Sequence, residues 1–131
     1  MGAEEREVVA IIGDGGFQMC IQELGTIYQT NCNIKIVILN NEFLGMVRQW
    51  QQLFFDKRYS ATEMVNPDFV QIAKGYYIKA QSVSHREDLA AAVNAMFDHD
   101  GPYLLEVKVE KEDNVFPMIP SGSGVGEIRL E

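Results

Sequence analysis

Two short polar clusters in this sequence carry residue types that could bind a metal ion and a phosphate. Gly13-Asp14-Gly15 follows the apolar run Val8–Ile12, and Asn40-Asn41 follows a second apolar run, Ile34–Leu39. If each run is a buried strand of an open parallel sheet, both clusters lie at the edge where such sheets bind ligands. A carboxylate oxygen of Asp14 and a carboxamide oxygen of Asn41, with a backbone carbonyl of the following turn, suit Mg²⁺. We therefore predict a site for magnesium and a diphosphate.

The glycines beside Asp14 favour the same kind of ligand. Gly13, Gly15 and Gly16 lack a β-carbon, so the backbone can turn sharply and its amides can approach phosphate oxygens. A helix that begins near Phe17 or Gln18 would direct its positive end at the anion. Alone, Gly-Asp-Gly is more typical of a tight turn, and it is the asparagine pair that favours the ligand site. The cluster matches neither Walker A nor Gly-x-Gly-x-x-Gly.

Alternating strand-like and helix-like patterns predict an α/β fold, an open parallel sheet with helices on both faces. The runs Val8–Ile12 and Ile34–Leu39 are rich in β-branched residues, which is typical of strands buried on both faces. Apolar residues at helical spacing from Phe17 to Tyr28 predict a helix between these two strands. Two more strands are expected at Tyr76–Ala80 and at Tyr103–Val109, the latter partly exposed.

Local signals predict the remaining helices and the domain organisation. Apolar residues at helical intervals indicate a helix over Leu44–Phe55, Asn66-Pro67 resembles a cap with proline at the first helical position, and Ser84–Glu87 resembles a capping box. We expect an α/β domain over residues 1–111 and a C-terminal tail over 112–131. Because doubly wound sheets usually have more strands than these four, we expect a piece truncated at the N-terminus. A small complete domain is the alternative.

Composition excludes several classes of partner. The net charge is −8 and no run of Lys or Arg is present, which argues against a nucleic-acid ligand. Cys20 and Cys32 form neither a C-x-x-C pair nor a zinc spacing, so we expect buried free thiols in a reducing compartment. No apolar run reaches the roughly 18 to 20 residues of a membrane span. A cytoplasmic protein without a membrane partner is expected.

The two clusters and their surroundings resemble a known family. Gly-Asp-Gly followed by Asn-Asn resembles the signature of thiamine diphosphate enzymes, and the wider sequence is similar to the catalytic large subunit of acetolactate synthase (acetohydroxyacid synthase), at its C-terminal cofactor-binding domain. The resemblance covers nearly the whole chain from Val8. The segments that carry it are Gly13-Asp14-Gly15-Gly16-Phe17-Gln18-Met19, Gln22-Glu23-Leu24, Leu39-Asn40-Asn41-Glu42-Phe43-Leu44-Gly45-Met46-Val47-Arg48-Gln49-Trp50 and Val115-Phe116-Pro117-Met118-Ile119-Pro120.

The resemblance implies a role for individual residues. Asp14 and Asn41 would be the side-chain ligands of magnesium, and Phe43 would offer its carbonyl oxygen. The residues that would line the cofactor are Gly13, Gly15, Gly16, Phe17, Met19, Gly45 and Met46. Val47 and Trp50 would lie on the substrate side, with Trp50 at the substrate entrance. Gly16 departs from the serine often found there, which removes a hydroxyl but leaves the backbone amide.

The resemblance also implies an activity. The parent enzyme would use thiamine diphosphate and Mg²⁺ to decarboxylate pyruvate and join the two-carbon unit to a second 2-keto acid such as 2-ketobutyrate, in branched-chain amino acid biosynthesis. The activating glutamate would belong to another domain, so no catalytic residue is expected in this chain, and it should be inactive alone. FAD is expected only in the full-length parent. The parent is expected to assemble as a dimer or tetramer, with a possible regulatory small subunit.

Two other functions stay open from the sequence. One is a different thiamine diphosphate-dependent decarboxylase or oxidase, such as a pyruvate oxidase or a glyoxylate carboligase, which would share the metal site. The other is a non-catalytic α/β module for ligand binding or interaction. Binding of magnesium and thiamine diphosphate would discriminate between the enzymes and the module.

Overall fold

Four parallel strands form the sheet at the centre of the computed structural model, which describes residues 6–130. In the order β1-β2-β4-β3 they are β1 (Val8–Gly13), β2 (Ile34–Asn40), β4 (Tyr103–Lys108) and β3 (Lys79–Val83). Every neighbouring pair is parallel, with Gly13 opposite Leu39 and Asn40 opposite Lys108. The carboxyl ends of β1, β2 and β4 therefore meet at one edge, which confirms the predicted open parallel sheet.

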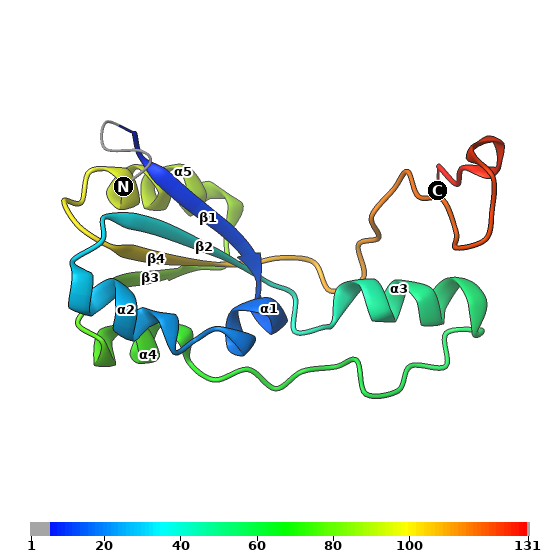
Figure 1. Ribbon diagram of the computed structural model, residues 1–131, viewed down its shortest axis with the longest axis horizontal. Helices are drawn as coiled ribbons and strands as arrows, with labels where there is room; N and C mark the ends of the chain where they lie inside the picture. The colour runs from blue at the N-terminus through cyan, green and yellow to red at the C-terminus, as the bar shows by residue number, and fades with distance from the viewer. Residues whose placement is uncertain (1–5, 131) are drawn as a thin grey trace.

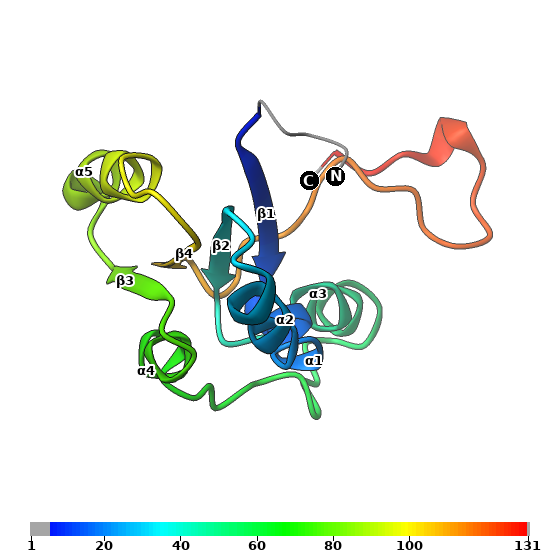
Figure 2. The same ribbon diagram turned by 60° about the vertical axis from the view of Figure 1, so that its left-hand side comes forward.

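Helices cover both faces of this sheet (Figures 1 and 2). One face carries α1 (Asp14–Met19), α2 (Glu23–Thr30) and α4 (Phe69–Gly75), and the other carries α5 (Arg86–Phe97). The core on the first side is built from Phe17, Leu24, Ile36, Ile38, Phe69, Ala73, Ile78 and Leu104. The core beneath α5 is built from Val83, Ala92, Met96, Tyr103 and Leu105. Within residues 6–130, no helix has the length and apolar character needed to cross a bilayer.

Helix α3 (Gly45–Phe54) extends beyond the carboxyl edge of the sheet, and the C-terminal segment lies beside it (Figure 1). The bounds of α3 confirm the helix expected over Leu44–Phe55. The buried Arg48 donates hydrogen bonds to Asp113 O (3.0 Å) and Asn114 Oδ1 (2.9 Å). Gln49 and Val115 exchange two hydrogen bonds, of 3.0 and 2.8 Å. The tail predicted from residue 112 is thereby joined to α3; it includes the 3₁₀ turn η1 (Val125–Glu127) and, after it, a bridge between Arg129 and Met118.

Burial of the strands differs from the expectation in two places. Strand β1 was predicted to be buried on both faces, yet it is an edge strand and Ile11 is 69% exposed. The reason is that α5 packs mainly on β3 and β4, so the β1 side of that face has no helix on it in the described structure (Figure 2). Strand β4 was predicted to be partly exposed in its later part; Lys108 and Val109 are exposed, but Glu106 is only 5% exposed because β4 is a central strand.

The predicted helix from Phe17 to Tyr28 is two helices, α1 and α2, separated by a turn in which Cys20 N donates to Phe17 O. Helix α1 begins at Asp14, not near Phe17 or Gln18, with Gly13 as its N-cap. The chain therefore enters a helix directly from β1, and Asp14 is held at the junction. Both cysteines are free thiols in this structure, as predicted, but each is half-buried rather than buried.

Three predicted boundaries are wrong for local reasons. Asp68 caps α4 by accepting a hydrogen bond from Gln71 N (2.9 Å), so the cap is not Asn66. Helix α5 has His85 as N-cap without a side-chain cap bond, so the Ser84 capping box does not form. The third strand begins at Lys79 rather than Tyr76, because the chain first turns with Tyr77 in the left-handed region (φ 60°).

Candidate cofactor site at the carboxyl edge of the sheet

A cleft of about 570 Å³ lies where β1, β2 and β4 end. It is lined by Gly13, Asp14, Gly15, Gly16, Leu39, Asn41, Phe43, Leu44, Gly45, Met46, Val47, Val109, Glu110, Asp113 and Val115. These come from the β1–α1 junction, from the end of β2 with the turn into α3, and from the segment after β4. The cleft thus brings together most of the residues that the sequence predicted for the cofactor and the metal.

Three predicted residues do not line this cleft with their side chains. Phe17 is buried in the core, with its ring edge-to-face on Phe69 at a centroid distance of 5.4 Å. Met19, at the end of α1, is 76% exposed outside the cleft. Trp50 packs on Phe54, one turn along α3, at 4.8 Å between centroids. The early start of α1 at Asp14 explains the positions of Phe17 and Met19. It turns Phe17, the fourth residue of the helix, toward the sheet, and it turns Met19, the last residue, away from the cleft.

Asp14 lies at the floor of the cleft with its carboxylate anchored from one side. The residue is 1% exposed, and its Oδ2 accepts hydrogen bonds from Glu42 N (3.0 Å) and Asn66 Nδ2 (2.6 Å). Within residues 6–130, Oδ1 accepts none. Because Glu42 N belongs to the peptide bond that follows Asn41, the carboxylate reaches the turn that carries the predicted second ligand. Asp14 Oδ2 is therefore engaged in hydrogen bonds within the protein, and Oδ1 is available for a ligand.

The asparagine pair divides into a structural residue and a cleft residue. Asn40 is 1% exposed and points away from the cleft, whereas Asn41 is half-buried and lines it. Asn41 Oδ1 accepts a hydrogen bond from Phe43 N (3.1 Å), which leaves this carboxamide oxygen a second lone pair. Glu42 adopts a left-handed conformation (φ 57°), and this turn directs its amide at Asp14.

A strand-like bridge fixes the turn after Asn41 from outside. Phe43 pairs with Glu63, and the bridge uses hydrogen bonds from Leu44 N to Thr62 O and from Met64 N to Glu42 O, both 2.8 Å. Neither bond uses the Phe43 carbonyl. The turn is therefore held rigidly against the loop that precedes α4, with the Phe43 carbonyl outside that pairing.

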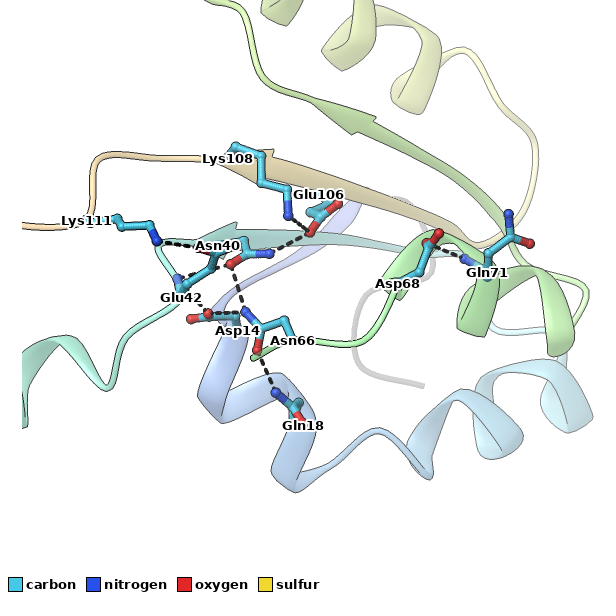
Figure 3. Close-up of polar contacts among 10 residues, drawn as sticks. All are labelled: Asp14, Gln18, Asn40, Glu42, Asn66, Asp68, Gln71, Glu106, Lys108 and Lys111. Carbon is cyan, nitrogen blue, oxygen red and sulfur yellow. Dashed lines mark hydrogen bonds and ion pairs between the residues drawn. The ribbon is translucent and has the colours of Figure 1, made fainter. Parts of the chain in front are cut away.

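Behind Asp14 lies a buried polar network that the sequence did not predict (Figure 3). Asn66 donates to Asp14 and also to Asn40 Oδ1 (2.9 Å), and Asn40 Nδ2 donates to Glu106 Oε1 (2.6 Å). Asn66 resembles a helix cap in the sequence, and Glu106 resembles the polar face of a partly exposed strand. A carboxylate in the middle of an otherwise apolar strand was the one signal that could have indicated a buried partner.

Two carboxyl groups near the cleft are held in the charged form. Burial alone would raise the pKa of Glu106, but hydrogen bonds from Ser82, Lys108 and Asn40 outweigh it, and the net pKa is lowered. Lys108 Nζ lies 2.9 Å from Glu106 Oε1. On the rim, the hydrogen bond from Lys111 Nζ to Glu42 (2.6 Å) lowers the pKa of Glu42 and raises that of Lys111.

The cleft has the chemistry of a hard-cation site. Its lining residues include the carboxyl groups of Asp14, Glu110 and Asp113 but no Lys or Arg, so an anion bound there needs a cation to carry it. The available oxygens of Asp14, Asn41 and Phe43 are the ligands that Mg²⁺ prefers, and Mg²⁺ usually takes its other ligands from phosphates and water. No group of three or more His, Cys, Asp or Glu residues within 6–130 could hold a metal by itself. The residues thus fit a cation shared with a bound diphosphate.

Comparisons with known proteins show the family of this domain. A family model described as thiamine pyrophosphate enzyme, C-terminal TPP binding domain, matches residues 1–107. The chain is 47% identical over 122 residues to the acetolactate synthase isozyme 2 large subunit of Escherichia coli (strain K12), covering 92% of this chain and 22% of that protein. It is 44% identical over 123 residues to the mitochondrial acetolactate synthase catalytic subunit of Saccharomyces cerevisiae, covering 94% and 18%.

A solved structure shows a similar fold. The thiamine diphosphate-dependent 4-hydroxybenzoylformate decarboxylase of Rhodococcus jostii RHA1 superposes with a TM-score of 0.76 at 29% sequence identity, over 83% of this chain and 20% of that one. The chain spans about a fifth of the length of the relatives that it matches.

Proposed function

Since the chain belongs to the thiamine pyrophosphate enzyme family, as its C-terminal TPP-binding domain, we propose that its cleft holds Mg²⁺ and the diphosphate of thiamine diphosphate (the same compound as thiamine pyrophosphate). The observation that carries the proposal is the contact between the Asp14 carboxylate and the peptide bond that follows Asn41 (3.0 Å). It places an anionic oxygen and an amide oxygen at the same edge of one cleft, and the family supplies the identity of the anion.

In this proposal each group has a separate task. Asp14 Oδ1, Asn41 Oδ1 and the Phe43 carbonyl hold the cation. Gly13, Gly15 and Gly16 bring backbone close to the diphosphate, and Gly45 leaves room for the carboxamide, because a β-carbon there would lie 3.2 Å from Asn41 Nδ2. Met46 lies beside the rest of the cofactor, and Val47, which also lines the cleft, lies on the substrate side. The structure supports no direct contact between a ligand in the cleft and the side chains of Phe17, Met19 and Trp50, because these side chains lie outside it.

When bound, thiamine diphosphate supplies the electron sink for breaking and forming bonds at the carbonyl carbon of a 2-keto acid. The chain's own residues orient the cofactor through its diphosphate and keep water from part of the cleft. Apolar side chains of Leu39, Val47, Val109 and Val115 form the walls above the polar floor. Val115 is held there by its two hydrogen bonds with Gln49, so the C-terminal segment completes the site.

We further propose that the chain is part of an acetolactate synthase large subunit. Identities of 44–47% with such subunits over most of this chain support this assignment. The corresponding activity would be the decarboxylation of pyruvate and ligation of the two-carbon unit to a second 2-keto acid, pyruvate or 2-ketobutyrate. This activity would need the remainder of the polypeptide, including a further domain that binds FAD. The large subunits would assemble as a dimer or tetramer, with a possible regulatory small subunit.

A second candidate is another thiamine diphosphate-dependent 2-keto acid decarboxylase. The similarity to the 4-hydroxybenzoylformate decarboxylase favours it, but at 29% identity against 47% it is the weaker assignment. Product analysis with pyruvate separates the two, since carboligation yields acetolactate and simple decarboxylation yields acetaldehyde.

Calorimetric titration of the 131-residue chain with thiamine diphosphate tests the binding proposal. We expect saturable binding in the presence of Mg²⁺ and its loss after chelation of the metal, because the acidic cleft cannot hold a diphosphate without a cation. Binding that is equally strong with and without divalent metal would contradict the proposal.

Gly13 offers a steric test of where the diphosphate lies. A β-carbon at Gly13 would meet nothing within 4 Å in the protein, and Gly13 lines the cleft. We expect Gly13→Ala to leave the melting temperature unchanged and to weaken thiamine diphosphate binding by about tenfold or more, which corresponds to about 1.4 kcal/mol. Gly75→Ala is the matched control, because its β-carbon also meets nothing and it lies outside the cleft. Unchanged binding in Gly13→Ala would mean that the ligand does not approach this backbone.

A further inference from the structure

Residues outside the cleft determine which way the side-chain amides behind Asp14 are oriented, and hence which groups donate and which accept (Figure 3). Gln18 Nε2 donates to Asn66 Oδ1 (2.7 Å), and this contact turns the amide nitrogen of Asn66 to the opposite side. That nitrogen donates to Asp14 Oδ2 (2.6 Å) and to Asn40 Oδ1 (2.9 Å). Asn66 therefore presents a donor to the Asp14 carboxylate.

The other end of the network enforces the same direction. Asn40 Nδ2 donates to Glu106 Oε1 (2.6 Å), so Asn40 Oδ1 must face Asn66 and the Glu42 amide (3.1 Å). Asn40 is 1% exposed and Glu106 is 5% exposed. If the Asn40 carboxamide exchanged its two ends, a buried carboxylate would face a carbonyl oxygen, which is costly without water. The orientation of Asn66 is thus set by Gln18 on one side and by Asn40 on the other.

The consequence for Asp14 is an asymmetric carboxylate. Both of its hydrogen bonds, from Asn66 Nδ2 and from Glu42 N, end on Oδ2. That oxygen is held toward the protein, so Oδ1 is the oxygen left for the cleft that Asp14 lines. Hydrogen bonds from outer residues commonly orient the ligands of a metal, and their loss typically lowers metal affinity 10- to 100-fold.

We propose that Asn66 is a positioning residue for the metal site: it holds Oδ2 of Asp14 so that Oδ1 is presented to the cation. The inference rests on the proposed function, because it assumes that Asp14 binds Mg²⁺. Asn66 is half-buried in the loop before α4, outside every helix and strand of the described chain. Its substitution should therefore leave the core and the sheet in place.

Two substitutions separate positioning from a merely structural link. Asn66→Ala removes the donor and adds no charge. Asn66→Asp keeps the size of the side chain and the acceptor for Gln18, but it places a second carboxylate oxygen against Asp14 Oδ2. The matched controls are Asn94→Ala and Asn94→Asp, which make the same changes at an exposed position of α5.

The test measures Mg²⁺ binding to the 131-residue chain by calorimetry at saturating thiamine diphosphate. We expect Asn66→Ala to raise the Mg²⁺ concentration at half-saturation 10- to 100-fold and Asn66→Asp to raise it further, while both Asn94 variants match the unsubstituted chain. As a second readout, the electron paramagnetic resonance spectrum of Mn²⁺ bound with thiamine diphosphate should change in Asn66→Ala, because the geometry around the metal changes. Thermal unfolding is recorded for every variant.

The outcomes distinguish failure of the positioning role of Asn66 from failure of the proposed binding of Mg²⁺ and thiamine diphosphate. If the unsubstituted chain binds Mg²⁺ and both Asn66 variants bind it equally well, the inference is overturned and the proposed function stands. If affinity falls together with the melting temperature while the Mn²⁺ spectrum is unchanged, Asn66 is only structural and positioning is again overturned. If the unsubstituted chain binds no Mg²⁺ with thiamine diphosphate, both are overturned.

Discussion

Asp14→Asn is expected to lower the Mg²⁺-dependent affinity for thiamine diphosphate by at least about 100-fold, the largest effect of any single substitution in this chain. The change removes the one anionic oxygen that the cleft floor offers to a cation, and loss of a ligand should exceed the 10- to 100-fold typical of its supporting residues. Calorimetry with and without Mg²⁺ measures it. Stability should change little, because the amide is isosteric and its oxygen can still accept from Glu42 N and Asn66 Nδ2.

Asp68→Asn is the matched control for this experiment. The same atoms change at a carboxylate that caps α4 and does not line the cleft. Asparagine is as good an N-cap as aspartate, so neither stability nor binding should change. Equal binding by Asp14→Asn and by the unsubstituted chain would show that Asp14 is not a metal ligand.

Glu106→Leu is expected to lower the free energy of unfolding by about 1–3 kcal/mol, the range for leaving a buried polar group without its partner. Leucine offers no acceptor to the buried Asn40 amide, which now bonds Glu106 Oε1 at 2.6 Å. Glu106→Gln should cost less, because its carbonyl oxygen can still accept from Asn40. Urea denaturation measures both changes. An equal loss in the two variants would mean that charge, rather than the acceptor, is what matters at this position.

The lowered pKa of Glu106 also predicts how stability depends on pH. Because the folded-state pKa lies below the unfolded-state value, the stabilising contribution is fully present above the unfolded-state pKa and is lost as pH falls through the folded pKa. The free energy of unfolding should therefore decline below about pH 4.5, the usual value for this group. In Glu106→Gln the decline should be smaller, with the exposed Glu42, whose pKa is lowered in the same direction, contributing to what remains.

The sequence was sufficient to predict a parallel α/β sheet and the two strand ends that line the candidate cleft. Such features follow from local patterns, since apolar runs and glycine or asparagine clusters mark strands and their ends. What it could not provide is which strand is central. The alternation of Glu106 and Lys108 indicates a solvated face, and Lys108 is exposed, yet Glu106 lies between β2 and β3. Burial here depends on partners distant in sequence, Asn40 and Ser82.

The candidate site shows the same division between local and distant information. Asp14 and Asn41 were predicted from spacing, and both line the cleft. Asn66 was misread as a helix cap, because Asp68 competes successfully for the first turn of α4. Its actual partners are Asp14, Gln18 and Asn40, all at least 26 positions away in the chain. No local pattern could indicate such contacts.

The most direct test of the account is to locate the cation. A crystal of the chain grown with thiamine diphosphate and Mn²⁺, in place of Mg²⁺, would show the metal by its anomalous scattering. We predict a single peak in the cleft within about 2.1–2.3 Å of Asp14 Oδ1 and Asn41 Oδ1, close to the distances at which oxygen ligands hold Mg²⁺, with diphosphate oxygens completing its shell. A metal bound elsewhere, or a diphosphate in the cleft without metal contact to Asp14, would contradict it.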